Sequence, residues 1–298
     1  MKRTFALLFV FLLFGKYNVL AQDTIFKSDP RATITIQKNK INAEDTLTTA
    51  KTLCFPLKKY GICIGNSREF NGIRINLADK NVKRINGLNV TFWLKPLANQ
   101  NAIVNGISVG VFPTAGSMQL INIGLLAIGA SHNLNGLTAG GFIIGSGGNI
   151  SGLSISGLVT MADGANSAVS GIAVSGIGIG ARKAINGIAI AGFAIGTDGE
   201  INGVASSLTY IKCENTFKGV ASTFGYFETN TMLGVAIAGF TDTKKTKGVS
   251  FALYNRTLEL HGFQFGLLNY AGNNPKFFRL LPFVNFNLSK DKNENSSQ

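Results

Sequence analysis

The segment Ser170–Gly196 reads SGIAVSGIGIGARKAINGIAIAGFAIG and contains two successive copies of one short unit. Each copy opens on a polar residue and a glycine, Gly171 or Gly187, and continues with large apolar residues at intervals of two, three and two positions. Intervals of two are typical of a β-strand, because alternate side chains share one face. The unit therefore predicts a short strand, a glycine corner and a second short strand.

Equivalent glycines recur along most of the chain and define an internal repeat. Successive copies start 14 to 19 residues apart, and in one degenerate copy a leucine replaces the glycine. The repeat positions are Gly72, Gly87, Gly106, Leu120, Gly136, Gly152, Gly171, Gly187, Gly203, Gly219, Gly234, Gly248 and Gly262. This spacing predicts an all-β chain built as a β-solenoid-like stack of about thirteen units of 14–19 residues.

The apolar residues of each unit are expected to form the core of this stack. In one well-preserved copy they are Ile188, Ile190, Phe193 and Ile195. A bend at the corner glycine, Gly192, would keep both apolar pairs on the same face. Stacking would then bury these pairs against those of the neighbouring units. A helix is disfavoured, because each glycine inside a helix costs about 1 kcal/mol relative to alanine.

An outer-membrane β-barrel is the alternative fold. Between Lys95 and Arg182 the only charged residue is Asp163, which is unusual for a water-facing surface. Strands of about ten residues joined by turns would also fit a bilayer-spanning barrel. Neighbouring barrel strands, however, run in opposite directions, whereas the glycine lies on the same side of every unit. The solenoid is therefore the favoured prediction.

The N-terminal segment 1–21 has the pattern of a secretory signal peptide. Lys2 and Arg3 precede the apolar run Phe5–Phe14, and small residues precede a cleavage position before Gln22. The apolar run is too short to span a bilayer as a helix. We expect export across the inner membrane to the cell surface or the outer membrane, with the periplasm as a further location.

The mature chain divides into four predicted parts. We expect an N-terminal β cap over residues 22–70, a glycine-rich repeat domain over 71–276, a closing strand over 277–289 and a disordered tail over 290–298. The cap includes the strand-like run ATITIQ at residues 32–37. Caps are needed because an open strand edge recruits other chains.

Composition and charge exclude several classes of protein. The chain is 45% hydrophobic and only 14% charged, which excludes intrinsic disorder. Its formal net charge is +13, but the basic residues are dispersed rather than gathered into a stripe with aromatic residues. We therefore expect no nucleic-acid binding, and no specific partner is predicted. An envelope component, an anionic envelope polymer or a second copy of the chain stay open as partners.

Three cysteines remain after the signal peptide. Cys54 and Cys63 are nine positions apart and could form a disulfide in an oxidising compartment, which would leave Cys213 unpaired. The other interpretation, in which all three are reduced core residues, is equally compatible with the sequence.

The catalytic candidates do not fit their motifs. GISVG at Gly106–Gly110 matches the nucleophile-elbow pattern with Ser108, but that elbow requires a strand-to-helix turn and a histidine base. Ser108 instead lies in a strand unit. His132 and His261 are the two histidines, and both are expected in loops or at variable repeat positions.

The candidate binding motifs are weak as well. IGIGAR at Ile177–Arg182 resembles a dinucleotide loop but belongs to a strand unit. Asp163 and Asp198 precede turn glycines and provide too few oxygen ligands for calcium. Four aromatic residues could stack on a carbohydrate, but core or interface packing is the favoured role of Phe224, Tyr226, Phe227 and Tyr254. We therefore predict no catalytic, cofactor-binding or metal site, and no enzymatic activity.

The tandem xGΦxΦ units, in which Φ is apolar, resemble those of bacterial surface-repeat proteins that carry a signal peptide. The late copy GFQFGLLN (Gly262–Asn269) and the closing LPFVNFNL share this resemblance, which covers residues 71–288. The resemblance implies secretion or display at the cell surface and brings no catalytic residues. The expected function is that of a noncatalytic, exported structural or adhesive repeat protein, and the alternative is an outer-membrane barrel or pore.

Overall fold

The computed structural model describes residues 52–57, 59–79, 81–93 and 101–289. They belong to one compact unit, Thr49–Gln298. The predicted signal peptide over residues 1–21, the run at residues 32–37 and the predicted tail over 290–298 lie outside the described residues.

The described chain consists almost entirely of β-strands and the turns between them. The elements are β1 (Leu53–Leu57), β2 (Tyr60–Ile64), β3 (Glu69–Ala78), β4 (Arg84–Trp93), β5 (Ile103–Gly110), β6 (Thr114–Gly124), β7 (Ala127–Gly140), β8 (Ile143–Ser146), β9 (Ile150–Ser156), β10 (Val159–Ala162), β11 (Ala168–Ser175), β12 (Gly178–Ala181), β13 (Ala184–Ala191), β14 (Ala194–Thr197), β15 (Glu200–Ser207), β16 (Tyr210–Thr223), β17 (Tyr226–Ala271), the 3₁₀ turn η1 (Lys276–Phe278) and β18 (Leu280–Asn287).

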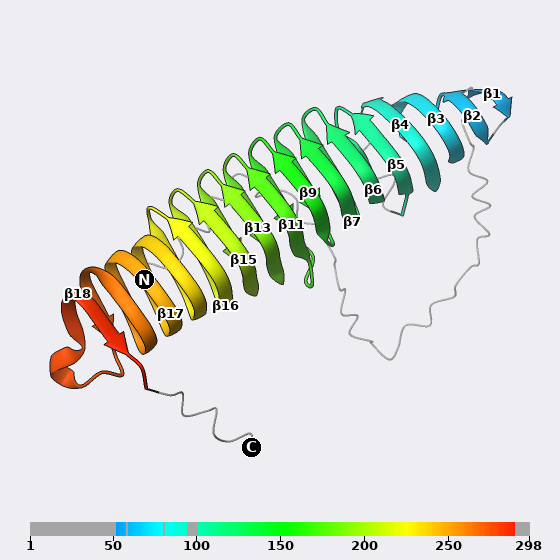
Figure 1. The fold of residues 1–298 in the computed structure, drawn as a ribbon. Helices are drawn as coiled ribbons and strands as arrows, with labels where there is room; N and C mark the ends of the chain where they lie inside the picture. The colour runs from blue at the N-terminus through cyan, green and yellow to red at the C-terminus, as the bar shows by residue number, and fades with distance from the viewer. Residues whose placement is uncertain (1–51, 58, 80, 94–100, 290–298) are drawn as a thin grey trace, which may run out of the picture. The chain divides into compact units, whose positions relative to one another are not determined.

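Successive coils stack in parallel and in register (Figure 1). Gly171 in β11 pairs with Gly152 in β9 on one side and with Gly187 in β13 on the other. The same register runs from β2 to β17, and the first and last coils lie at opposite ends of the stack. The predicted β-solenoid is confirmed. The barrel alternative is wrong for the described residues, because the coils progress in one direction and do not close on themselves.

The repeat glycines form one column, and two physical requirements explain them. Gly187 has a φ of +109°, and a Cβ there would lie 2.2 Å from the carbonyl oxygen of Gly171. A side chain is therefore excluded both by the backbone conformation and by the close approach of the preceding coil. Gly61 extends the column by one coil, because it pairs with Gly72. Leu120 occupies the column with a φ of +81°, an unfavourable conformation for a leucine.

The predicted orientation of the apolar pairs is wrong. Ile188 and Ile190 point outward and are 40% and 45% exposed, and Phe193 is exposed at the corner. Only Ile195 of this unit is buried. The corner glycine, Gly192, therefore does not bring the two pairs to one face. It is required because a Cβ there would lie 2.0 Å from a carbonyl oxygen of the preceding coil.

The interior of the coil is narrow, which explains this orientation. Ile185 and Ile195 are the large inward side chains of the coil and are fully buried. Ala189 and Ala191 take the other inward positions of β13, so the remaining interior space is filled by small side chains. Because strand residues alternate between the two faces, small inward residues force the large ones between them to point outward.

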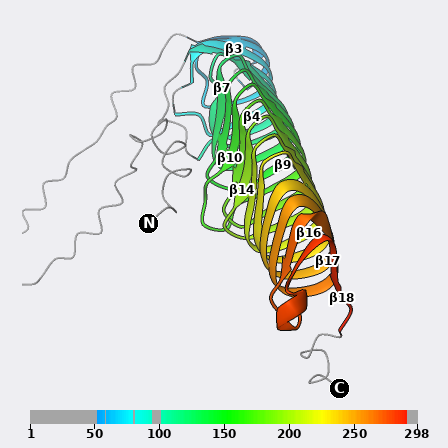
Figure 2. The same ribbon diagram turned by 90° about the vertical axis from the view of Figure 1, so that its left-hand side faces the viewer.

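Antiparallel strands close both ends of the stack. At the N-terminal end β1 pairs antiparallel with β2, and Cys54 lies opposite Cys63. At the C-terminal end β18 pairs antiparallel with the last part of β17 and lies at the end of the nested coils (Figure 2). Each terminal strand contains a proline, Pro56 or Pro282, which lacks the N–H needed to continue a ladder.

Candidate functional site

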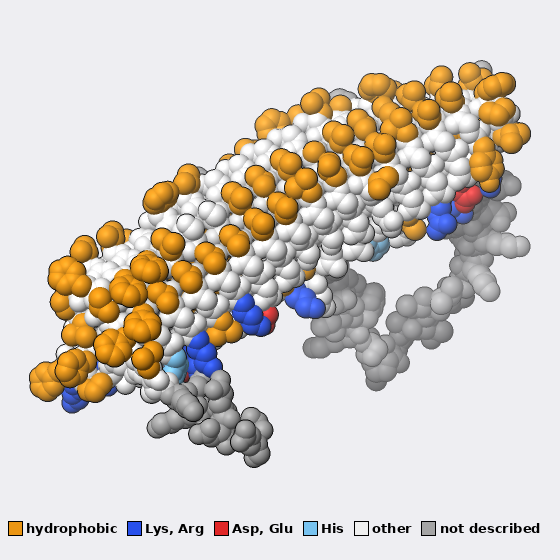
Figure 3. Space-filling model, viewed as in Figure 1, with side chains coloured by type: hydrophobic (Ala, Val, Ile, Leu, Met, Phe, Trp, Pro, Cys, Tyr) orange, Lys and Arg blue, Asp and Glu red, His pale blue; other side chains and the backbone are white. Residues whose placement is uncertain are grey.

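Outward apolar side chains form one continuous surface along the stack, which we call the apolar face (Figure 3). It has three rows, at one, at three and, for the corner row, at five or six positions after the glycine column. The row one position after the column is Ile62, Ile73, Leu88, Ile107, Ile121, Leu137, Leu153, Ile172, Ile188, Val204, Val220, Val235, Val249 and Phe263. The row three positions after the column is Ile64, Ile75, Val90, Val109, Ile123, Ala139, Ile155, Val174, Ile190, Ser206, Ser222, Ile237, Phe251 and Phe265. The corner row is Leu77, Phe92, Leu125, Phe142, Leu158, Ile177, Phe193, Leu208, Phe224, Phe240, Leu253 and Leu267.

The backbone register aligns these rows along the stack. Ile172 lies beside Ile188, and Ile188 lies beside Val204, so equivalent side chains follow one another at the strand spacing. At about 4.8 Å per coil, the face is about 60 Å long, and the five residues from the first row to the corner row, counted as extended chain, make it at most about 17 Å wide. The resulting area is at most about 1,000 Å², whereas the largest apolar patch on a typical monomer covers about 300–600 Å². Such a face is a candidate interaction site.

The terminal strands continue the apolar face beyond the glycine column. Phe55 in β1 is exposed and lies opposite Ile62, the first member of the row. At the other end the ring centroid of Phe286 in β18 lies 6.1 Å from that of Phe263. The caps therefore present apolar side chains on the same side as the coils.

Charged side chains border the apolar face, whereas Ser206 and Ser222 are polar members of its middle row. Charged residues gather along one edge of the view in Figure 3. On the other side of the glycine column, Asn86 donates a hydrogen bond to Asn71 at 2.6 Å, and Asn105 donates one to Asn86 at 2.9 Å. Ladders of this kind satisfy the amide groups between coils. The stack is therefore amphipathic in cross-section.

Charged side chains of the border pair across coils. Arg182 lies 3.0 Å from Asp163, and Lys245 lies 3.4 Å from Glu259. Lys59 donates a hydrogen bond to Glu69, which lowers the pKa of that carboxyl. These exposed pairs neutralise part of the basic excess along the border, although each contributes little to stability.

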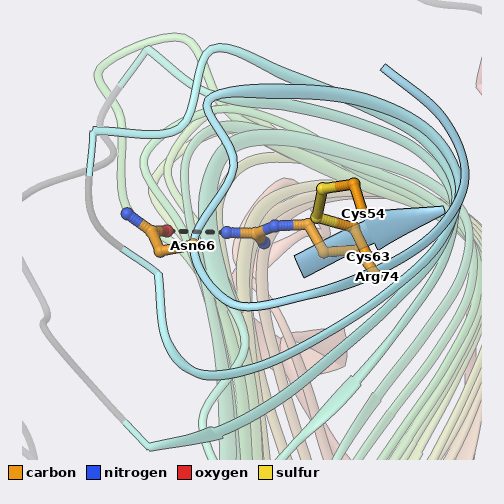
Figure 4. The surroundings of a disulfide bond; sticks show 4 residues. All are labelled: Cys54, Cys63, Asn66 and Arg74. Carbon is orange, nitrogen blue, oxygen red and sulfur yellow. Dashed lines mark hydrogen bonds between the residues drawn. A yellow bond between two sulfur atoms is a disulfide. The ribbon is translucent and has the colours of Figure 1, made fainter. Parts of the chain in front are cut away.

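A buried polar cluster fills the interior at the N-terminal end. Arg74 is fully buried, and its guanidinium pairs with the carboxylate of Asp79. The same guanidinium donates hydrogen bonds of 2.7 Å to Asn89 and to Asn66, the second of which is drawn in Figure 4. Thr91 donates to the second oxygen of Asp79 at 2.9 Å. Arg74 and Asp79 compensate each other's charge inside the coil, so the cluster has a structural role.

The Cys54–Cys63 disulfide covers this cluster. Cys63 is adjacent to Arg74 in the parallel register of β2 and β3, so the bridge lies one strand beyond Arg74 in the stack, and the guanidinium extends toward Asn66 (Figure 4). Of the two interpretations of the cysteines, the disulfide is the one the structure contains. The bridge ties the terminal hairpin to itself at the end that β1 closes.

Cys213 is unpaired and buried, and the register explains its place. It lies in one column with Thr197 and Thr229, whose hydroxyls hydrogen-bond to backbone groups at the turn. The thiol of Cys213 donates in the same way to the carbonyl of Gly199 at 3.2 Å. Burial raises its pKa, so the thiol form is favoured. Cys213 therefore replaces a turn threonine.

The structure separates the candidate catalytic residues. Ser108 points into the interior, 2% exposed, in the column between Asn89 and Asn122. His132 is exposed in β7, and His261 lies in the last coils, where its Nδ1 contacts the carbonyl oxygen of Ser289 at 2.8 Å. No described contact joins Ser108 to either histidine. The prediction that the chain is not an enzyme stays a prediction.

The weaker binding motifs occupy strands and turns. Residues 177–182 span the corner before β12 and that strand, and their Arg182 pairs with Asp163. Asp163 and Asp198 both lie in exposed turns, in different coils. Among the described residues no group of three or more His, Cys, Asp or Glu side chains could hold a metal ion.

The four candidate aromatic residues do not form one strip. Phe227 is buried, with its ring edge-to-face on Phe217 at 5.1 Å, whereas Phe224 is 84% exposed at a corner. Tyr226 stacks on Tyr210 at 5.9 Å, and its hydroxyl donates to Asp242. Burial, followed by the nearby Asp242 charge, raises the pKa of Tyr226 to about 12. Phe227 and Tyr226 therefore serve packing and hydrogen bonding, whereas Phe224 belongs to the exposed corner row.

The apolar face is the feature that sequence reasoning missed. Its signal was present in the sequence, because small residues recur at the inward positions Ala173, Ala189 and Ala205 while large ones flank them.

No bilayer-length apolar helix occurs in the described part of the chain. No protein family, curated protein or solved structure matches the chain.

Proposed function

We propose that the chain is a noncatalytic, exported structural or adhesive repeat protein of the cell surface, and that it acts through its apolar face. The observation that carries this proposal is the face itself, at most about 1,000 Å² of outward aliphatic and aromatic side chains on a rigid stack. A surface of this size is costly to leave in water, at about 25 cal/mol per Å². It therefore calls for a partner rather than for a substrate.

Two further features support export. The segment 1–21 has the charge, apolar run and cleavage pattern of a signal peptide. The disulfide between Cys54 and Cys63 is of a kind that persists in oxidising compartments outside the cytoplasm. The same two features agree with the expected surface location.

The test of this proposal is fractionation of the cells that make the protein. Mass spectrometry of the mature chain is expected to give an N-terminus at Gln22, and protease added to intact cells is expected to degrade the chain. Washing the envelope with high salt or carbonate is expected to release it. A full-length chain that starts at Met1 in the cytoplasm would refute export, and release only by detergent would refute a peripheral solenoid.

A further inference from the structure

We propose that the apolar face is the interface of a homodimer, in which two copies pack these faces against each other with their stacks antiparallel. This inference rests on the proposed function in one respect, namely that the face is the working surface. It goes further by naming the occupant as a second copy of this chain.

The area of the face matches the requirement of a stable dimer. Two faces of at most about 1,000 Å² bury at most about 2,000 Å² in total. Standard interfaces bury about 1,200–2,000 Å², and obligate homodimers begin near the upper limit of that range. The face also has the anatomy of such an interface, because its centre is apolar and its border carries the asparagine ladder and paired charges.

The spacing of the rows favours a second copy over other partners. The rows are in register at the strand spacing, so they form parallel ridges along the stack. A second copy has ridges of identical pitch, and two such faces can interdigitate as packed β-sheets do, about 10 Å apart. A fluid lipid surface gains nothing from this regularity.

Ion pairing within the charged border reduces its attraction to an anionic bilayer. Membrane-surface proteins combine an apolar face with an excess of Lys and Arg at its border. Here basic side chains of the border pair with carboxylates of neighbouring coils, as Arg182 does with Asp163 and Lys218 does with Glu200. A bordering ladder of neutral asparagines is compatible with a second protein surface and provides no attraction to phospholipid headgroups.

The sizes of the side chains in the middle row select the orientation. In the antiparallel dimer, the two copies are related by a two-fold axis that lies in the plane of the face and runs along the strands. The first coil of one copy then lies opposite the last coil of the other, and the two middle rows face each other. Ser206 then faces Ile123, and Ala139 faces Ile190, so each small residue meets a large one. With the stacks parallel, Ser206 would instead face the partner's Ser206 and leave a gap. Because gaps in an apolar interface are costly, the antiparallel arrangement is preferred.

The dimer is tested on the purified mature chain by analytical ultracentrifugation. Wild-type protein is expected to sediment with twice the mass of one chain at micromolar concentration. Ile172→Lys places a charge near the centre of the face, at an outward position that the fold tolerates, and is expected to weaken the dimer by about tenfold or more. The matched control is Asn166→Lys, which adds the same charge in an exposed turn of the same coil and is expected to stay dimeric. Circular dichroism checks that both variants are folded.

A wild-type chain that is monomeric at these concentrations would overturn the proposal, and so would an Ile172→Lys variant that stays dimeric. A monomer that sediments with phosphatidylcholine vesicles, and loses this binding in Ile172→Lys, would replace the second copy with a bilayer. None of these outcomes bears on export, which the fractionation tests separately.

The orientation has its own test, a short thiol cross-linker applied to single-cysteine substitutions. A mixture of Ser206→Cys and Ile123→Cys chains is expected to form cross-linked pairs, and Ser206→Cys alone is not. Cross-linking of Ser206→Cys to itself would overturn the antiparallel arrangement.

Discussion

Two glycines of one coil provide a sharp test of the fold, because only one of them is required by its surroundings. Gly187 belongs to the glycine column, with a φ of +109° and only 2.2 Å between a would-be Cβ and the Gly171 carbonyl oxygen. Gly196 lies in β14 with an ordinary φ, and a Cβ there would meet no atom within 4 Å. The change Gly→Ala is chemically the same at both positions, so the comparison isolates the surroundings.

The expected effects have opposite signs. At Gly187, the left-handed backbone conformation destabilises an alanine by about 1–2 kcal/mol. Overpacking against a carbonyl that is held in a ladder adds about 1–3 kcal/mol. We therefore expect Gly187→Ala to destabilise by about 2–5 kcal/mol. At Gly196, alanine lowers the entropy of the unfolded chain and is expected to stabilise by about 0.4–1 kcal/mol.

Thermal and urea unfolding, followed by circular dichroism, measure both changes. For a chain of this size, 1 kcal/mol corresponds to about 2–4 °C, so Gly187→Ala is expected to lower the melting temperature by about 5 °C or more. Because each coil contacts only its neighbours, amide exchange is expected to rise first in β11, β13 and β15. Equal melting temperatures for the two variants, or a less stable Gly196→Ala, would refute the reasoning about the column.

Three further predictions concern other sites. Leu120→Gly is expected to raise the urea midpoint slightly, because relief of the φ of +81° exceeds the loss of a mostly exposed side chain; a lower midpoint would contradict this. Asp79→Ala leaves the charge of Arg74 buried without its carboxylate and is expected to cost about 3–5 kcal/mol in urea unfolding; a cost below about 1 kcal/mol would contradict this. Burial raises the pKa of both Tyr210 and Tyr226, the latter to about 12, so the folded chain holds protons that the unfolded chain releases above about pH 10. Stability is therefore expected to fall as pH rises from 10 to 12, and Tyr226→Phe to reduce that slope; an unchanged slope would exclude Tyr226 as its source.

The glycine column was readable from the sequence, because close approach between coils imposes a glycine at a fixed place in each unit. Gly187 and its equivalents are needed for local reasons, and such requirements leave a regular pattern. Gly61 escaped detection although YGICI has the pattern of the unit. Its distance to Gly72 is shorter than the repeat interval, because the coil there begins from a tight hairpin rather than from a preceding coil.

The direction of the apolar side chains could not be read with the same certainty. Periodicity shows that Ile188 and Ile190 share a face, but it does not show whether that face is inside. The usual assumption, that the larger side chains are buried, fails where the interior has room for only two of them per coil, Ile185 and Ile195. For this reason the large apolar residues of the interaction surface were assigned to the core.

The disulfide illustrates a third kind of limit. The sequence places Cys54 and Cys63 nine positions apart, a spacing compatible with a bridge or with two separate thiols. Only the antiparallel register of β1 and β2, which sets the two residues opposite each other, decides between them. That register depends on the connection between β1 and β2 and is not encoded in the repeat.

The prolines at the two terminal strands have a consequence for size. Pro56 and Pro282 each remove a backbone donor from the strands that end the stack, so growth by adding strands at the ends is opposed. The length of the stack is then set by the number of repeats in the sequence, at about 4.8 Å for each unit of about 16 residues. A deletion or duplication of one unit would change, by one such step, each distance along the stack that spans that unit.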